Sequence, residues 1–315
     1  MSLIPALYAR RLRASPVARA ADATTKKTTS SATRRSARQS NARDEAAALR
    51  VHEDGDLFEI GVGRFWRIFE TRDYMQTKFN LLEALTDVGT HGALSEALVE
   101  AQDALRLSRG GGMGIREVVP ALMLNLGKLQ ECYDFIKWWV TCDPDRRYDW
   151  GNPSLPYLNV QGADMNESIE CFEKSSMHHL AALAFIKLTL AQALRDEINA
   201  QRVAESDGKA ALPDIAGERL KKFLASKELA NKSEDKVALQ HKLEMQAKKT
   251  ITMVHAKNKH FWRMMLDPKQ AASVPMSPFY AFGEPGEVLQ FLKPNAQLWL
   301  TTPGAKAFVG TYHKV

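Results

Sequence analysis

Apolar residues recur at spacings of three and four along the chain after residue 65, which is the period of helices that bury one side. The first two apolar stripes contain Phe65, Ile68, Phe69, Met75, Phe79 and Leu82, and then Leu94, Leu98, Ala101 and Leu105. Gly89 and Gly92 stand between the stripes and indicate a turn. The pattern therefore predicts a helical hairpin.

A second hairpin is predicted after a glycine-rich turn at residues 109–114. Its stripes contain Val118, Val119, Leu122 and Leu126, and then Cys132, Phe135, Ile136 and Trp139. A tetratricopeptide repeat is a helix pair of about 34 residues, with Leu-Gly ending its first helix and Ala midway along its second. Gly89 and Gly127 take the glycine position. Ala101 then takes the close-contact position between two helices, whereas Glu100 falls on the polar side.

The rest of the chain also favours helix, so we predict an all-α fold of tetratricopeptide-like antiparallel helix pairs, in an α-solenoid-like arrangement. Residues 51–205 form the predicted repeat domain, which contains an irregular stretch near residues 148–167 and then a long helix. Charges of both signs dominate residues 206–250, which we interpret as an exposed helix or a helical insertion. Short helices in residues 251–315 are predicted to cap the repeat.

The first 50 residues differ in composition and are predicted to be a disordered basic tail or a transit peptide. Residues 1–43 hold ten of the 43 Lys and Arg residues and one of the 37 acids, so the remainder of the chain carries a net charge of −3. A plain basic tail predicts an intracellular protein, cytoplasmic or nuclear, and a transit peptide predicts import into a mitochondrion or plastid. The longest apolar run is far shorter than the roughly 20 residues of a membrane-spanning helix, so we expect no membrane span.

The cysteines and histidines offer little chemistry at the spacing at which they occur. Cys132 and Cys142 form no C-x-x-C pair with each other or with Cys171. Cys132 shares an apolar stripe, which predicts a buried thiol. Cys171, His178 and His179 are close in sequence, but adjacent histidines point about 100° apart on a helix. We therefore assign no metal-binding residue.

Two further segments could suggest ligand binding but are better explained as turns. The glycine-rich run at 109–114 follows a helix and lacks the Gly-Lys-Ser/Thr ending of a phosphate-binding loop. Asp143, Asp145 and Asp149 are interrupted by Arg146 and Arg147, with no bidentate Glu at the twelfth position of a calcium loop. Catalytic and cofactor-binding residues are likewise unassigned.

Aromatic residues are the candidates for partner binding, because exposed aromatic side chains often anchor protein interfaces. We select Trp138, Tyr148 and Trp150. On helical spacing Trp139 belongs to the core stripe and Trp138 lies beside it. A basic cluster could bind an acidic partner or RNA, although a solvated face is the simpler interpretation; it comprises Lys248, Lys249, His255, Lys257, Lys259, His260 and Arg263.

Several short segments resemble tetratricopeptide-like repeat proteins of fungi and algae, some of which carry an MYND-type zinc finger. The resemblance is carried by residues 70–75, 106–107, 113–116, 126–127, 130–135, 148–151, 155–158, 284–287 and 302–305. This chain lacks the cysteines that such a finger requires, so no finger activity carries over. The resemblance implies a helical interaction protein without an assigned reaction.

Architecture and resemblance together predict a protein–protein interaction scaffold with no catalytic activity and no cofactor. Stacked helix pairs would present a concave surface to another protein or a peptide segment. The alternative is an RNA-associated organellar factor that uses the basic tail and the Lys/His cluster against phosphates. Neither interpretation identifies the partner or fixes the oligomeric state.

Overall fold

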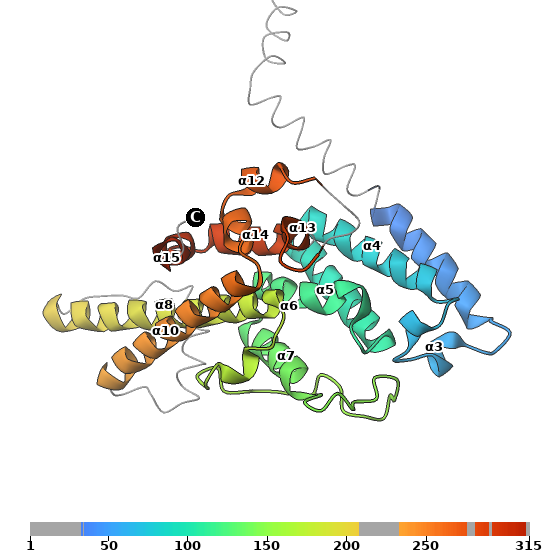
Figure 1. Ribbon diagram of the computed structural model, residues 1–315, viewed down its shortest axis with the longest axis horizontal. Helices are drawn as coiled ribbons and strands as arrows, with labels where there is room; N and C mark the ends of the chain where they lie inside the picture. Colours follow the sequence, from blue (N-terminus) through green and yellow to red (C-terminus); the bar gives the residue numbers. More distant parts are fainter. Residues whose placement is uncertain (1–32, 34, 208–232, 276–280, 290–291, 313–315) are drawn as a thin grey trace, which may run out of the picture. The chain divides into compact units, whose positions relative to one another are not determined.

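The computed structural model describes residues 33, 35–207, 233–275, 281–289 and 292–312 (Figure 1). Within these residues all regular secondary structure is helical, and the only β-type pairing is an isolated bridge between His52 and Gly55. The predicted all-α class is therefore confirmed. The chain divides into two compact units. Unit 1 runs to Ile115 and includes Trp150–Pro153, and unit 2 contains Arg116–Asp149 and the chain from Ser154 onward.

Unit 1 is built around one antiparallel helix pair. Its described helices are residues 35–50, α3 (Leu57–Ile60), η1 (Phe65–Arg67), α4 (Arg72–Val88), α5 (His91–Leu107) and η2 (Gly112–Gly114). Helix α4 ends at Gly89, whose φ of 68° is the left-handed conformation that favours glycine. Helix α5 begins at Thr90, whose side chain accepts a hydrogen bond from the Ala93 N–H. The first predicted hairpin is thus confirmed.

A helix spans residues 35–50, where the sequence predicts a tail without structure, so this part of the prediction is wrong. Leu49 is buried, and Arg35 and Gln39 both bind the Glu96 carboxylate of α5. These contacts with the helix pair stabilise a helix in a segment whose basic composition predicts disorder. Residues 1–32 and 34, on which the transit-peptide interpretation falls, lie outside the described part of the chain.

Unit 2 contains the remaining helices. They are most of α6 (Ile115–Asn125), α7 (Leu129–Thr141), η3 (Glu170–Phe172), α8 (Met177–Asp207), α10 (Ser233–Lys257), α11 (Phe261–Leu266), α12 (Pro268–Ala272), α13 (Pro285–Leu289), α14 (Leu292–Thr301) and α15 (Ala305–Tyr312). A turn at Gly127, with φ of 71°, separates α6 from α7 as predicted. The two predicted hairpins lie in different units, so a repeat stack remains a prediction.

Helices α8 and α10 lie side by side and form the centre of unit 2 (Figure 1). They run antiparallel: Lys236, early in α10, pairs with Glu197 late in α8 at 2.8 Å. Leu243, Ala247 and Ile251 of α10 are fully buried. The described part of this region is helical as predicted, but α10 is not exposed on all sides, because its charged positions surround a narrow apolar stripe that packs on α8. Residues 208–232 of the predicted insertion lie outside the described residues.

The C-terminal helices pack on α8 through large aromatic rings. The ring centroids of Trp262 in α11 and Trp299 in α14 lie 4.8 Å apart, and Phe185 of α8 lies 5.3 Å from Trp299. Helix α8 is long and apolar enough to cross a membrane by length and composition alone. However, 83% of its most apolar window is buried inside the structure, as in a core helix.

Candidate functional site

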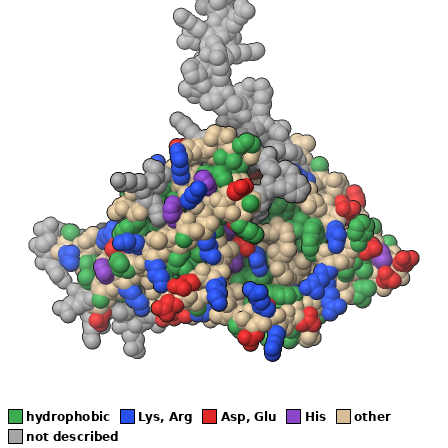
Figure 2. Space-filling view, viewed as in Figure 1, with side chains coloured by type: hydrophobic (Ala, Val, Ile, Leu, Met, Phe, Trp, Pro, Cys, Tyr) green, Lys and Arg blue, Asp and Glu red, His purple; other side chains and the backbone are tan. Residues whose placement is uncertain are grey.

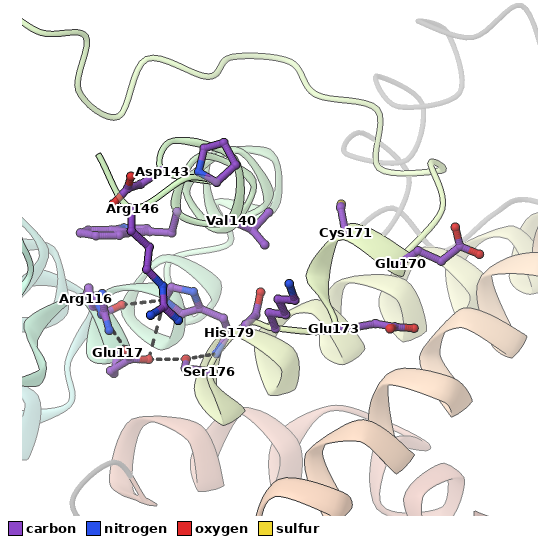
Figure 3. Close-up of a pocket in the computed structure, with 14 residues that line it drawn as sticks. Arg116, Glu117, Val140, Asp143, Arg146, Glu170, Cys171, Glu173, Ser176 and His179 are labelled. Atoms are coloured by element: carbon purple, nitrogen blue, oxygen red, sulfur yellow. Dashed lines mark hydrogen bonds and ion pairs between the residues drawn. The ribbon is translucent and has the colours of Figure 1, made fainter. Parts of the chain in front are cut away.

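Unit 2 contains an open cavity of about 560 Å³. Its walls come from the start of α6, the end of α7 with the loop that follows, and the segment from η3 to the start of α8. Figure 3 shows Glu117, Ser176 and His179 together at one end, whereas Glu170 and Cys171 lie at the other end. Charged and hydroxyl side chains supply most of the lining, so the cavity is suited to a polar ligand.

Glu117 is a largely buried charged group at one end of this cavity. Its side chain is 13% exposed, its Oε2 accepts a hydrogen bond from the Ser176 hydroxyl, and its Oε1 lies 2.9 Å from the Nε of Arg116. Burial by itself would raise the pKa of Glu117. The neighbouring His179 and His178, the Ser176 hydroxyl and Arg116 outweigh burial and hold that pKa below its ordinary value. Glu117 is therefore ionised at neutral pH.

Two buried histidines flank this carboxylate. The Nδ1 of His178 lies 3.7 Å, and the Nε2 of His179 lies 3.8 Å, from the Oε2 of Glu117. The Nε2 of His179 also lies 3.1 Å from the Arg116 carbonyl oxygen, which requires a proton on that nitrogen for a hydrogen bond. Burial lowers the pKa of His178 to about 4 and also lowers the pKa of His179. Both rings are therefore neutral at neutral pH, and they attract Glu117 through a positive charge only in acid, where the rings and the carboxyl group titrate.

The hydrogen bonds of Ser176 argue against a serine nucleophile. Its Oγ donates to Glu117 and accepts the N–H of His179 at 3.2 Å, which caps the start of α8. A catalytic serine instead donates its proton to a histidine ring. Glu117 already places a negative charge at the N-terminus of α8. The helix dipole would therefore add little to the affinity for an anionic ligand at this position. The cluster organises the cavity wall and does not form a Ser–His relay.

The metal-site residues considered from the sequence do not converge. Cys171 is exposed, and its Sγ lies 3.6 Å from the Nζ of Lys137. The ring of His178 packs against Phe261, with centroids 6.5 Å apart. Among the residues that the structure describes, no group of three His, Cys, Asp or Glu side chains could hold a metal ion.

The rim of the cavity combines an aromatic ring with charged groups. The guanidinium of Arg116 lies 5.2 Å from the ring centroid of Trp139. Arg146 has φ of 58°, a left-handed conformation that is uncommon for a residue other than glycine. Asp143 accepts the N–H of Tyr148 through Oδ1 at 2.9 Å, so it stabilises the turn that places Arg146 at the rim.

The structure places the predicted partner-binding aromatics in different environments. Trp138 is only 3% exposed, and its Nε1 donates to Asn159 Oδ1 at 3.1 Å. The prediction that Trp138 is an exposed anchor for a partner is therefore wrong. Tyr157 packs on the Trp138 ring with centroids 4.9 Å apart, because the irregular segment after residue 148 covers this side of α7. Trp139, assigned to the core, is half-buried at the cavity instead.

Tyr148 and Trp150 are both half-buried. The Tyr148 hydroxyl donates to the Pro156 carbonyl at 2.5 Å in unit 2. Trp150 belongs to unit 1, where its ring lies 3.9 Å from the position that a Cβ on Gly110 would take. Trp66 lies 3.4 Å from the corresponding position on Gly112. The glycine-rich run thus provides a surface on which two indole rings pack, and a role for Tyr148 or Trp150 in binding stays a prediction.

The remaining cysteines have the environments of structural thiols. Cys132 is fully buried as predicted, and burial raises its pKa well above the ordinary value. Cys142 is half-buried, and burial with the nearby Asp143 carboxylate raises its pKa to about 11. A low thiol pKa is the usual requirement for a nucleophilic cysteine. Neither thiol meets it.

The basic cluster of α10 and α11 is only partly committed to internal contacts. Lys249 pairs with Glu173 at 3.1 Å, and Lys248 lies 4.8 Å from the Tyr312 ring centroid. Lys257, Lys259 and Arg263 are exposed. On the face of the molecule shown in Figure 2, Lys and Arg side chains alternate with Asp and Glu side chains. This face therefore lacks the continuous basic stripe that polyanion binding favours.

Sequence reasoning missed a buried lysine in unit 2. Lys187 is fully buried in α8, and its Nζ donates to the carbonyl oxygens of Met165 and, at 3.4 Å, Glu167. Burial lowers the pKa of Lys187 to about 7. The Glu167 side chain in turn accepts from Tyr133 at 2.8 Å and from Lys137 at 2.6 Å. The sequence signal for this buried lysine is its position inside the apolar run of residues 180–194.

Comparison of the chain with protein-family models, with curated proteins and with solved structures finds no match.

Proposed function

We propose that this protein is a protein–protein interaction module in which the cavity of unit 2 receives a segment of a partner protein. One observation carries the proposal: Glu117, Ser176 and His179 contact one another at one end of the cavity, whereas charged side chains at its rim are exposed. These mutual contacts fix the shape of this end of the cavity, which suits the cavity to holding a bound segment in one orientation.

The rim favours a peptide over a simple ion. Arg146, Lys174 and Glu170 are exposed around the cavity and make no ion pair within the described residues. Both signs of charge are thus presented within one concave site. An extended protein segment can complement such a mixture through its own side chains and backbone, while the half-buried Trp139 ring offers an apolar contact.

The helical architecture is compatible with this role. The antiparallel pair of α4 and α5 has the hairpin form of a tetratricopeptide-like unit, and proteins built from such units commonly bind other proteins. A tetratricopeptide-like scaffold remains our inference from hairpin form and sequence resemblance. Unit 2 adds a cavity that does not depend on a repeat stack.

A photo-crosslinking experiment tests the proposal. A photoreactive amino acid would replace Val140, which lines the cavity, and in a matched protein Val237, which is 39% exposed on α10. We expect one protein to be crosslinked from position 140 and not from position 237. Equal yields at the two positions would contradict binding in the cavity.

RNA binding is the alternative, favoured by the exposed Lys257, Lys259 and Arg263. Phosphate-dominated affinity falls steeply as salt rises. Binding of a single-stranded RNA that declined by orders of magnitude between low and moderate salt, and that was lost on deletion of residues 1–45, would support this alternative. If the amount of partner protein captured changed little with salt concentration, binding of a protein segment in the cavity would be favoured.

A further inference from the structure

An aromatic and cationic surface lies where η1 leads into α4 in unit 1. Phe69 is 75% exposed, which is unusual for a large apolar side chain. The Arg72 guanidinium lies 5.6 Å from the Phe69 ring centroid and 5.9 Å from that of the half-buried Trp66. The Nε of Arg72 also donates to the Trp66 carbonyl at 3.3 Å, which fixes the guanidinium between the rings.

The arginines of this surface lack acidic partners. Arg67 and Arg72 are exposed and make no ion pair within the described residues. Two other arginines of the same unit are paired: Arg106 lies 2.8 Å from Asp103, and Arg50 lies 3.3 Å from Asp56. The terminal guanidinium nitrogens of Arg72 can therefore receive a carboxylate from outside, while the rings hold them in place.

We propose that Trp66, Arg67, Phe69 and Arg72, here called the Arg–Phe surface, bind an acidic segment of a partner protein that carries an aromatic or aliphatic side chain. The apolar side chain would cover the exposed Phe69 ring. One or two carboxylates beside it would bind the guanidinium groups of Arg67 and Arg72. Aromatic and arginine side chains placed together dominate the energetics of many protein interfaces.

The charge distribution favours an acidic protein segment over nucleic acid. Outside residues 1–43 the chain carries a net charge of −3. Glu70 and Asp73 are exposed next to the arginines in sequence and would repel any further negative charge, so the surface accepts one or two acidic groups and not a run of successive phosphates. A segment with few carboxylates meets the arginines without extending along these acids. The surface belongs to unit 1, so the inference stands independently of the cavity in unit 2.

The test uses the full chain and a fluorescent synthetic peptide in which one phenylalanine is flanked by two glutamates and all other residues are uncharged. Fluorescence anisotropy would compare it with a peptide that has lysine in place of glutamate and with an oligouridylate. The variants are Phe69→Ala and Arg72→Gln. Their matched controls are Phe282→Ala, at a side chain that is 93% exposed, and Arg106→Gln, at an arginine already paired with Asp103. Circular dichroism verifies that each variant is folded.

We expect the glutamate peptide alone to bind, with affinity reduced about tenfold or more by Phe69→Ala and Arg72→Gln and changed less than about twofold by the controls. Val140→Trp in the cavity should leave this affinity unchanged, which separates this inference from the proposed function. The proposal would be overturned if the glutamate peptide did not bind, if the lysine peptide bound equally well, or if the oligouridylate bound more tightly. It would also be overturned if the Phe69→Ala and Arg72→Gln variants bound the glutamate peptide as tightly as their control variants.

Discussion

The Nζ of Lys78 in α4 lies 2.6 Å from the Oε2 of Glu100 in α5, and the same Nζ lies 2.8 Å from Asp103. Lys78 is only 6% exposed. Although burial opposes its charge, Tyr74, Asp103 and Glu100 raise the pKa of Lys78 above its ordinary value. Glu100 lies on the polar side of α5 as the pattern indicates, but it holds a buried cation. A change at Glu100 therefore disturbs the helix pair.

Ala101→Leu should destabilise unit 1. Ala101 is fully buried, and a larger side chain in a filled core typically costs about 1 to 3 kcal/mol. The matched control is Val99→Leu on the same helix, where the side chain is 61% exposed. Urea midpoints of the two variants would be compared. An unchanged midpoint for Ala101→Leu would show that this position is not a close contact between helices.

Gly61→Ala should also destabilise unit 1, for a different steric reason. A Cβ at Gly61 would lie 2.7 Å from the Leu57 carbonyl oxygen and 2.9 Å from the Ile68 Cδ1, both closer than van der Waals contact. At Gly92, in the first turn of α5, a Cβ would meet nothing within 4 Å. Gly92→Ala should therefore be neutral or stabilising, by up to about 1 kcal/mol. Thermal melts that ranked the two variants in the opposite order would contradict the packing around Gly61.

Stability should rise with pH above neutrality because of Lys187. Folding lowers the pKa of Lys187 from 10.5 to about 7, so the unfolded chain binds more protons than the folded chain between these values. The free energy of unfolding then increases with pH across this window, by at most about 1.4 kcal/mol per pH unit, and Lys187 adds no slope below it. Urea unfolding at pH 6, 8 and 9 measures the slope.

The variant Lys187→Met separates this lysine from other groups that titrate in the same range. It removes the titrating amine while keeping an unbranched side chain of similar length. The difference in stability between the wild type and Lys187→Met should shift in favour of the wild type as pH rises from 7 to 9. A difference that did not change with pH would mean that Lys187 is not buried as described.

Acid should destabilise unit 2 through His178. Its folded pKa of about 4 lies below the ordinary 6.5, so the unfolded chain takes up the proton first and stability falls as pH falls from about 6.5 to 4. The lowered pKa of Glu117 acts in the same direction below its ordinary value of 4.5. His178→Gln should lose less stability than the wild type between pH 7 and pH 4.5. If the stability of the wild type and of His178→Gln fell equally with pH, His178 would not be the cause of the acid destabilisation.

Helical periodicity predicted α4, α5, α6 and α7 because each buries one continuous stripe against a neighbour. Periodicity could not say which of Trp138 and Trp139 is covered, since this depends on the distant segment that brings Tyr157 onto Trp138. It also underestimated the burial of α10, whose apolar stripe is narrow among many charges. The cavity was missed because Glu117, Ser176 and His179 converge only after α6 and the start of α8 come together.

Binding of a partner protein in the cavity of unit 2 is tested by comparing the affinities of two matched variants. The partner protein identified by crosslinking at position 140 would be titrated calorimetrically into the wild type, Val140→Trp and Val237→Trp. The bulky indole at position 140 should occupy part of the cavity and weaken binding at least about tenfold, which is at least about 1.4 kcal/mol. Val237→Trp should bind like the wild type. If a folded Val140→Trp bound the partner as tightly as the wild type, the partner would not bind in the cavity.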